Sequence, residues 1–204
     1  MFSIKLMIFL IASGATITIT GAVEEKINVL VMYESLCPDS VRFMTNQLGP
    51  NYDSLKDVIN VNLVPFGKSE SVNNGAQFFC QHGPAECEGN RMQSCVLDQT
   101  SNQDAQVKFA VCQMSGQYDS SSQYCAQLAG LSGDITECMN SDLGTVLQLE
   151  AEKITKIYDP SFVPTIVYDG KFDQKLQDRS LSNFKDVVCS LLQERGSIAF
   201  NTVC

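Results

Sequence analysis

The sequence predicts an α/β fold in which a disulfide-rich helical insertion, approximately residues 69–159, separates a βαβ part from a ββα part. Two short apolar runs with β-branched residues flank a helical pattern near the N-terminus. The insertion holds six of the nine cysteines. A strand pattern around an Asp-Gly pair and an amphipathic helix pattern follow it. The length beyond position 22, about 180 residues, predicts a single domain over residues 23–204.

The first part of the chain has the pattern of strand, helix and strand. Residues 26–33 are a short apolar and β-branched run, which favours a buried strand. Residues 38–48 start with proline and carry recurring apolar residues, and the Gly-Pro pair at 49–50 predicts the end of this helix. Residues 57–67 repeat the strand pattern. This order indicates a βαβ unit with a right-handed crossover.

The rest of the chain carries helix signals and one more strand signal. Helix patterns within the insertion cover residues 105–114 behind a cap at 101–104, a stretch that starts at 120–122, and residues 141–158. Residues 161–172 predict a hairpin with its turn at Asp169-Gly170, and residues 181–196 predict an amphipathic helix that stops at a glycine. The complete order is that of a thioredoxin-like fold with a helical insertion.

Residues 1–22 have the form of a secretory signal peptide. One lysine is followed by an apolar core at 6–12 and then by small residues. This core is too short to span a bilayer, and no later segment is apolar over a sufficient length, so we expect no membrane insertion. The net charge of −9, without a cluster of lysines and arginines, leaves no electrostatic footprint for nucleic acid. We therefore expect a soluble mature chain in a lumen or outside the cell.

The nine cysteines predict structural disulfides, because secreted proteins fold in oxidising compartments. Nine is odd, so at least one thiol is left without an intramolecular partner. Cys37 stands far from the others and is the natural candidate. We expect Cys189 and Cys204 to pair, while the connectivity of the others stays open. The eight expected disulfide cysteines are Cys80, Cys87, Cys95, Cys112, Cys125, Cys138, Cys189 and Cys204.

Cys37 lies where a predicted strand meets a predicted helix. Unpaired backbone N–H groups and the helix dipole at this position favour the thiolate, which is the nucleophilic form. Asp39 acts in the opposite direction, because one negative charge disfavours another nearby. Three residues after Cys37 the chain has Ser40 instead of a second thiol. We predict that Cys37 is a nucleophile and that Ser40 belongs to the same site.

Pro164 stands just before the last predicted strand. In thioredoxin-like folds a cis-proline at this place packs beside the reactive cysteine. Most X–Pro bonds are trans, so the expectation of a cis bond rests on the strand, the hairpin and the upstream cysteine. A cis bond would expose the backbone of Val163, so that an extended substrate could pair with it by strand addition.

Residues 80–95 read CQHGPAECEGNRMQSC. This stretch resembles the signature of the gamma-interferon-inducible lysosomal thiol reductase (GILT) family, C-Q-H-G-x-x-E-C-x-x-N-x-x-x-x-C. The resemblance extends over essentially the whole mature chain. It implies a thioredoxin-like fold and the reduction of protein disulfides in acidic endolysosomal compartments or after secretion. The matching positions are Cys80, Gln81, His82, Gly83, Glu86, Cys87, Asn90 and Cys95.

The chain departs from the family pattern at the active site, where family reductases carry Cys-x-x-Cys and residues 37–40 read CPDS. Ser40 cannot resolve a mixed disulfide, although its hydroxyl can hydrogen-bond to the Cys37 thiolate. We predict a GILT-like thiol oxidoreductase with one nucleophilic cysteine. It would need an external small thiol, such as glutathione or cysteine, and no other cofactor. The alternative is a secreted binding protein, non-catalytic or tethering through its thiol, that has lost dithiol reductase activity.

Two further interpretations concern His82, the single histidine of the chain. Cys80, His82, Cys87 and Cys95 are of the types that bind zinc. Their spacing is not that of a standard zinc finger and secreted cysteines usually pair, so we expect no metal. We favour a role for His82 in bracing the loop around Cys80 and Cys87 over a role as general base, because nothing in the sequence places it near Cys37.

The expected partners are disulfide-containing proteins or peptides, whereas the physiological substrate and the oligomeric state stay open. The chain has no Asn-x-Ser/Thr sequon. Family members that reach the lysosome through a mannose-based tag need such glycans. We therefore expect secretion, with the endolysosomal lumen as the alternative.

Overall fold

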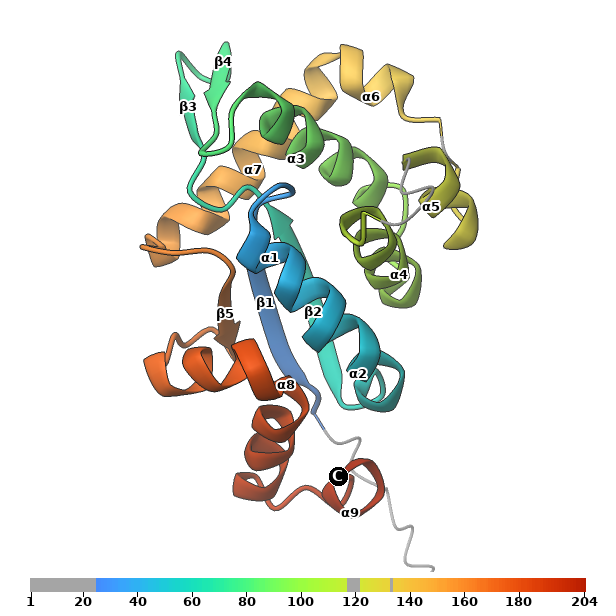
Figure 1. Ribbon diagram of the computed structural model, residues 1–204, viewed down its shortest axis with the longest axis vertical. Helices are drawn as coiled ribbons and strands as arrows, with labels where there is room; N and C mark the ends of the chain where they lie inside the picture. The colour runs from blue at the N-terminus through green and yellow to red at the C-terminus, as the bar shows by residue number, and fades with distance from the viewer. Residues whose placement is uncertain (1–24, 117–121, 133) are drawn as a thin grey trace, which may run out of the picture.

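The computed structural model describes residues 25–116, 122–132 and 134–204, so the predicted signal peptide lies outside the described residues (Figure 1). A three-stranded sheet of order β2-β1-β5 forms its centre. β1 is parallel to β2 and antiparallel to β5, and β3 and β4 form a separate antiparallel pair. The strands are β1 (Ile27–Tyr33), β2 (Ile59–Pro65), β3 (Glu70–Val72), β4 (Gln77–Phe79) and β5 (Thr165–Tyr168).

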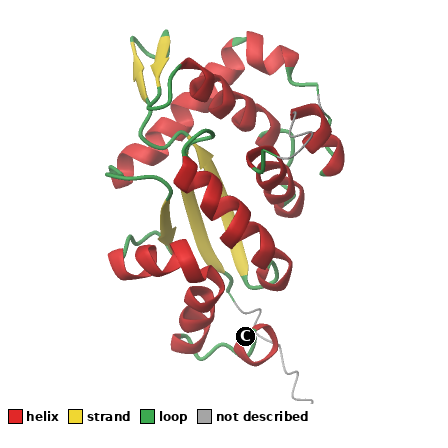
Figure 2. Ribbon diagram, viewed as in Figure 1, coloured by secondary structure: helices red, strands yellow, loops and turns green. Residues whose placement is uncertain are grey.

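Helices surround the central sheet, and a continuous block of them lies between β2 and β5 in the chain (Figure 2). This arrangement confirms the predicted α/β fold with a helical block between its two parts. The helices are α1 (Pro38–Phe43), the π-helical turn η1 (Met44–Leu48), α2 (Gly49–Leu55), α3 (Pro84–Leu97), α4 (Gln103–Met114), α5 (Ser122–Leu128), α6 (Thr136–Asn140), α7 (Asp142–Tyr158), α8 (Gln174–Glu194) and α9 (Phe200–Val203).

The alternation of side chains along β1 divides the core between the two faces of the sheet. Val29, Val31 and Tyr33 point into the larger cluster, which α1, η1, α2, α4 and α8 complete. Met32 points to the other face, where it packs with Ala151 of α7. Both faces of β1 are therefore covered, which accounts for the nearly continuous apolar run that predicted this strand.

The Gly-Pro pair at 49–50 does not end the first helix, contrary to the prediction. α1 passes into η1, and α2 continues to Leu55. The Gly49 N–H donates to the carbonyl of Met44, five residues earlier, and Pro50, which has no N–H to donate, follows directly in α2. A Cβ at Gly49 would lie 2.7 Å from Val111 of α4, so glycine allows the two helices to touch.

The predicted hairpin after β5 is present as a turn but not as a pair of strands. Asp169 and Gly170 both adopt positive φ, as an Asp-Gly turn requires. The second strand consists of one bridge, between Tyr168 and Lys171. Asp173 then caps α8 by accepting backbone N–H bonds, so the chain enters a helix directly. A kink at Asn183 separates this first part of α8 from the second part, which corresponds to the helix predicted over residues 181–196.

The helices of the insertion follow their capping signals. Asn102 accepts the N–H groups of Asp104 and Ala105 at the start of α4, and Ser141 caps α7. α5 starts at Ser122, while residues 120–121 of the predicted start lie outside the described residues. The β3–β4 hairpin and α3 were not predicted, because the cysteine motif conceals the helical pattern of α3.

Four disulfides cross-link the chain, and the expected pairing of Cys189 with Cys204 is confirmed. Two of them join helices of the insertion: one links α3 to α6, and one links α4 to α5. The fourth closes a short ring at the start of α3. The other three pairs are Cys80–Cys87, Cys95–Cys138 and Cys112–Cys125.

Phe184→Ala is expected to lower the free energy of unfolding by about 3–5 kcal/mol, because the buried ring leaves a cavity in the larger cluster. The ring of Phe184 lies edge-on to that of Phe43, with 5.6 Å between centroids. Urea unfolding measures the loss. Leu181→Ala, on an exposed part of α8, should cost less than about 1 kcal/mol, and equal costs for the two variants would contradict this account of the core.

Candidate active site

Cys37 is the free cysteine among the described residues, as predicted. It follows β1 and is the N-cap residue of α1, with Pro38 as the first helical residue. Its Sγ lies 3.7 Å from the carbonyl oxygen of Val163, to which the thiol donates. The residue keeps 7% of its surface exposed, and the neighbouring Leu36 keeps 47%. Cys37 is thus shielded on most sides but lies next to an exposed apolar side chain.

The Val163–Pro164 peptide bond is cis, which confirms the expectation for Pro164. It brings the Val163 carbonyl to Cys37, across 126 residues of sequence. A Cβ at Gly67 would lie 2.6 Å from Glu34 Cγ and 2.8 Å from Val163 Cγ1, so both side chains lie against this glycine. Gly67 has a φ of 58°, a second reason why glycine is required there.

Ser40 is fully buried, and its hydroxyl oxygen accepts the backbone N–H of Glu34 at 3.3 Å. Within the described part of the chain, no hydrogen bond joins Ser40 to the sulfur of Cys37. The Ser40–Cys37 hydrogen bond that the sequence allowed is therefore absent from the described residues. The hydroxyl instead fixes the turn between β1 and α1, on which Cys37 is carried.

The residues of the 80–95 motif hold that turn from the other side. Asn90 Oδ1 accepts the backbone N–H of Ser35 at 2.8 Å, and the Ser35 hydroxyl donates to the carbonyl of Glu86 at 3.2 Å. A Cβ at Gly89 would lie 2.5 Å from Ser35 Oγ, so α3 packs directly on the turn. The motif thus supports Ser35, two positions before Cys37.

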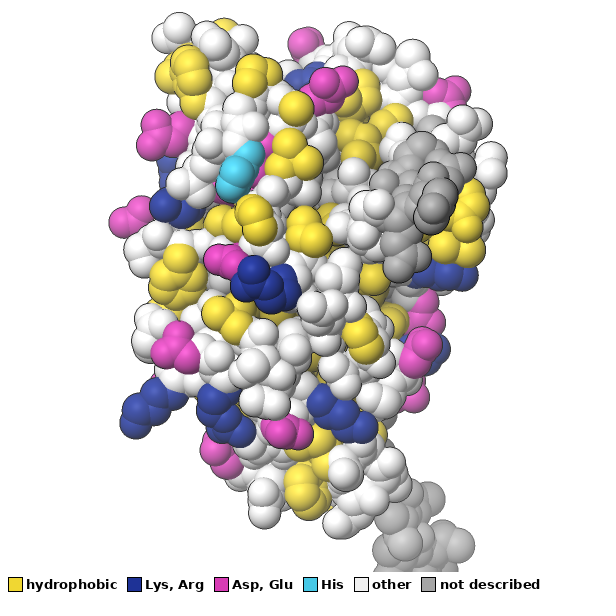
Figure 3. All heavy atoms as spheres, in the orientation of Figure 1, with side chains coloured by type: hydrophobic (Ala, Val, Ile, Leu, Met, Phe, Trp, Pro, Cys, Tyr) yellow, Lys and Arg dark blue, Asp and Glu magenta, His cyan; other side chains and the backbone are white. Residues whose placement is uncertain are grey.

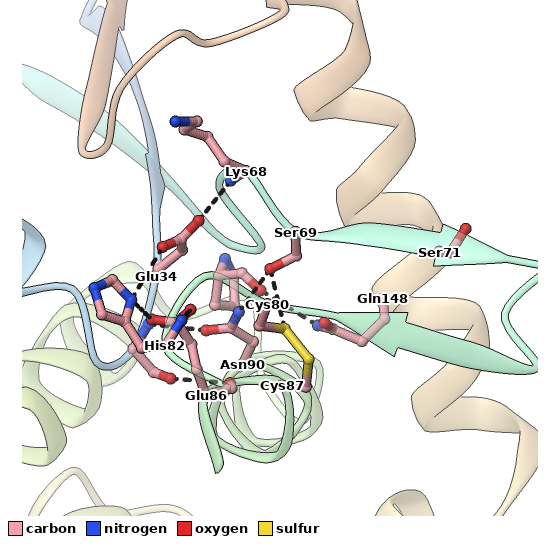
Figure 4. The surroundings of a disulfide bond; sticks show 12 residues. Glu34, Lys68, Ser69, Ser71, Cys80, His82, Glu86, Cys87, Asn90 and Gln148 are labelled. Carbon is pink, nitrogen blue, oxygen red and sulfur yellow. Dashed lines mark hydrogen bonds and ion pairs between the residues drawn. A yellow bond between two sulfur atoms is a disulfide. The ribbon is translucent and has the colours of Figure 1, made fainter. Parts of the chain in front are cut away.

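Figure 4 shows a cluster formed by Glu34, His82 and Glu86 beside the Cys80–Cys87 disulfide. The side chains of both glutamates are fully buried. His82 Nδ1 lies 2.6 Å from Glu86 Oε2 and 3.5 Å from Glu34 Oε2. The His82 side chain is 37% exposed, and Figure 3 shows it on the surface of this face. His82 therefore lies closer to the turn between β1 and α1, which carries Cys37, than the sequence indicated.

The pKa of Glu34 is raised to about 7, chiefly because burial disfavours the charged form. The neighbouring Glu86 acts in the same direction. The backbone N–H of Lys68, which donates to Glu34 Oε1 at 2.7 Å, and the His82 ring act in the opposite direction. A buried carboxyl that titrates near neutrality thus stands three residues before Cys37.

Cys80, His82, Cys87 and Cys95 do not form a zinc site, because all three cysteines are in disulfides. A different set, Glu34, His82 and Glu86, has ligand atoms within 4.8 Å of one another. Hydrogen bonds within the protein account for this set: His82 bonds to Glu86 through both its ring and its backbone N–H, and Lys68 bonds to Glu34.

Sequence reasoning found Cys37, Ser40, Val163, Pro164 and the motif, but it missed Glu34 and Ser35. The available signal was a charged residue placed directly after an apolar strand and directly before the reactive turn. The structure places Cys95 away from this group, in the disulfide to α6.

Solved structures with the same arrangement give the chain a fold class, the thioredoxin and DsbA-like fold. The reduced disulfide bond oxidoreductase DsbG of Mycobacterium tuberculosis superposes with a TM-score of 0.59, at 17% identity, over 87% of this chain and 82% of that chain. DsbA of Chlamydia trachomatis gives 0.56 at 15% identity, over 84% and 88%. Identities this low establish the fold alone, and they confirm the predicted one.

The sequence itself gives the family. Residues 28–129 match the family model described as gamma interferon inducible lysosomal thiol reductase (GILT). GILT-like protein 1 of Drosophila melanogaster is 34% identical over an alignment of 185 residues, and the match covers 80% of this chain and 74% of that protein. The gamma-interferon-inducible lysosomal thiol reductase of Carassius auratus is 31% identical over an alignment of 173 residues, and the match covers 81% of this chain and 68% of that protein. The chain therefore belongs to the GILT family of thiol reductases.

No helix in the described ranges combines the length and the apolar character needed to cross a membrane.

Glu34→Gln is expected to remove a pH-dependent loss of stability. The pKa of Glu34 rises from 4.5 to about 7 on folding. The stability that the protonated Glu34 side chain contributes is therefore fully present below pH 4.5 and is lost as the pH rises through 7. Wild type should lose about 1–2 kcal/mol relative to the variant between pH 4.5 and pH 7.5, by urea unfolding. Glu150→Gln, on an exposed position of α7, should follow wild type. A constant difference between wild type and Glu34→Gln at all pH values would refute this assignment.

Asn90→Ala should loosen the reactive turn, because the buried Ser35 N–H loses its acceptor at a cost of about 1–3 kcal/mol. We expect iodoacetamide to label Cys37 several-fold faster in this variant than in wild type under native conditions. Mass spectrometry measures the rate of labelling. Asn140→Ala, an exposed position in α6, is the control. Equal labelling rates in the two variants would show that Asn90 does not hold the turn.

Proposed function

We propose that this chain is a thiol oxidoreductase that acts on protein disulfides through Cys37 alone and needs an external small thiol to complete turnover. The observation that carries the proposal is a free cysteine at a helix N-cap, in contact with a cis-proline loop, with serine at position 40. Membership of the GILT family supports disulfide reduction as the reaction class.

The proposed cycle begins when the Cys37 thiolate attacks one sulfur of a substrate disulfide. A Cys37–substrate bond forms, and the other substrate sulfur leaves as a thiolate and takes a proton from solvent. The thiolate of an external thiol then attacks Cys37 Sγ and releases the second substrate thiol. A further external thiol attacks the mixed disulfide on Cys37, which frees the cysteine. Two external thiols are oxidised to one disulfide for each substrate disulfide that is reduced.

Val163 and Pro164 would hold the substrate in this proposal. No described residue accepts the backbone N–H of Val163, and its carbonyl already faces Cys37. An extended peptide that pairs with this backbone would bring its disulfide to the sulfur. The exposed Leu36 offers apolar contact on the same turn. We infer protein or peptide disulfides as the substrate class, and no metal or tightly bound cofactor enters the cycle.

We infer that the chain works after secretion, with the endolysosomal lumen as the second candidate. The signal-peptide pattern at residues 1–22 and the lack of a glycosylation sequon support secretion. The names of several relatives refer to the lysosome, which supports the second compartment as an alternative.

The low exposure of Cys37 and the engagement of Ser40 with the backbone favour a second candidate function. In this alternative the same loop holds extended peptides without covalent chemistry, or tethers a partner through Cys37. A non-catalytic chain would capture peptides equally well after Cys37→Ala.

The proposal predicts the behaviour of two variants in an insulin disulfide-reduction assay with glutathione. Cys37→Ala should lower the rate by about two orders of magnitude or more, to that of glutathione alone. Without glutathione, reduced wild type should stop as a Cys37–substrate mixed disulfide, detectable by mass. Ser40→Cys should release its substrate without glutathione, because the new thiol resolves the mixed disulfide.

Ser54→Ala, an exposed serine of α2, serves as the control and should behave as wild type in both formats. Glutathione-dependent activity that persists unchanged in Cys37→Ala would remove the proposal. Peptide capture by that same variant, with no activity in wild type, would establish the binding alternative.

A further inference from the structure

We propose that the Cys80–Cys87 disulfide is a second thiol-exchange site, at which an anionic small thiol such as glutathione docks beside Cys87 and reduces the bond. This site lies outside the proposed function and does not use Cys37. Figure 4 shows the disulfide with Ser69 and Asn90 around it.

A pocket opens next to Cys87. It has a volume of about 790 Å³ and lies among β4, α3, α6 and α7, which come together at one end of the molecule (Figure 1). The volume is within the range of small-molecule sites. Cys37, Val163 and Pro164 are not among its walls, so it is separate from the candidate active site. The lining residues used below are Phe78, Cys87, Glu88, Arg91 and Met139.

Arg91 provides a fixed positive charge in the pocket wall. Its guanidinium donates to the carbonyls of Met139 and Ser141 and to the hydroxyl of Thr145, which hold it in place. It forms no ion pair with a carboxylate among the described residues. A thiol that carries a carboxylate could therefore supply the missing anion. Glu88, which is exposed, lines the same pocket and could bind the ammonium group of such a thiol.

The contacts of the two sulfurs differ, and they favour attack at Cys87 over attack at Cys80. Cys80 and Cys87 are both half-buried, but Cys87 lines the pocket and Cys80 does not, so a thiol docked in the pocket attacks Cys87. Ser69 donates its hydroxyl to Cys80 Sγ at 3.2 Å. A hydrogen bond to sulfur stabilises a thiolate, so Cys80 is the better leaving group. Attack at Cys87 with departure of Cys80 follows from these two contacts.

The other disulfides lack this combination. Cys95 and Cys125 are buried, so their bridges are shielded. Cys204 is exposed, but no described hydroxyl donates to either sulfur of the Cys189–Cys204 bridge. The Cys80–Cys87 ring spans seven residues, against 43, 13 and 15 for the others. The shortest ring restricts the unfolded chain least, so its bridge adds least to stability by that mechanism.

The exchange balances without any other reactant. The thiolate of the docked thiol attacks Cys87 Sγ, a mixed disulfide forms on Cys87, and Cys80 leaves as a thiolate. A second small thiol attacks the docked sulfur of the mixed disulfide and releases Cys87. Two small thiols become one small disulfide, and the protons that they lose are taken up by Cys80 and Cys87. The electrons come from the small thiol alone.

The experiment uses the full mature chain with Cys37→Ala, so that failure of the proposed function cannot affect the result. The protein is incubated with increasing glutathione or with increasing 2-mercaptoethanol, which is uncharged. Samples are quenched with acid and alkylated, and mass spectrometry gives the reduction rate of each disulfide. The exposed Cys189–Cys204 bridge is the internal control for access.

We expect the Cys80–Cys87 rate to saturate with glutathione and to rise linearly with 2-mercaptoethanol, while Cys189–Cys204 shows linear dependence on both. Adding Ser69→Ala should lower the Cys80–Cys87 rate about three- to tenfold and leave Cys189–Cys204 unchanged. Asn90 also donates to Ser69, so Ser69→Ala could act by loosening the packing there. Looser packing would make the exchange faster, whereas loss of the hydrogen bond to Cys80 would make it slower. The direction of the change in rate therefore separates the two causes.

Two results would overturn the proposal. One is a Cys80–Cys87 rate that depends on glutathione as linearly as that of Cys189–Cys204. The other is a rate no higher than those of Cys95–Cys138 and Cys112–Cys125. Because both comparisons are made between disulfides of the same folded Cys37→Ala chain, neither result depends on the folding of the Ser69→Ala variant.

Discussion

The hydrogen bond from the Ser35 N–H to Asn90 Oδ1 is the contact on which the rest of the site depends. The turn between β1 and α1 has no ladder or helix to satisfy its backbone, yet Glu34 and Ser35 are almost completely buried. Buried backbone donors need partners, and here the partners come from Ser40 within the turn and from α3 across the interface. The position of Cys37 is therefore set by a helix some fifty residues further along the chain.

The motif at residues 80–95 becomes understandable as a support for that turn. The Cys80–Cys87 ring holds the segment before α3, and Gly83 caps α3 with a φ of 85°. His82 and Glu86 then place polar atoms against Glu34. The result is a buried carboxyl three residues before Cys37, in a setting where the protonation of that carboxyl changes near neutral pH. Conformation and charge at the reactive turn thus have a common origin in one short motif.

The two halves of the site come from opposite ends of the chain. The thiol belongs to the first strand–helix junction, and the cis-proline loop belongs to the start of β5. Gly67 allows them to meet, because any side chain at this position would collide with Glu34 and Val163. The insertion between β2 and β5 adds α3 and its disulfides without interrupting the central sheet. The thioredoxin-like framework therefore keeps its geometry while the insertion supplies the support.

Much of the fold could be predicted from local patterns. The strands β1 and β2 follow from apolar runs, and α4 and α7 follow from caps and periodicity, because these signals act within a few residues. The Gly-Pro pair at 49–50 misled the prediction, because a π-helical turn absorbed it under packing from α4. The second strand after Asp169-Gly170 was lost to the cap of α8, a local competition that two short signals could not decide.

The sequence by itself determined that one cysteine is left over, that proline precedes the last strand and that serine stands at position 40. These are facts of composition and order, which no packing can change. Only the tertiary structure decided that Ser40 bonds to Glu34 rather than to the sulfur, that His82 lies near the reactive turn, and that Cys87 borders a pocket. Contacts between distant segments depend on how helices pack, and that information is spread over the whole chain.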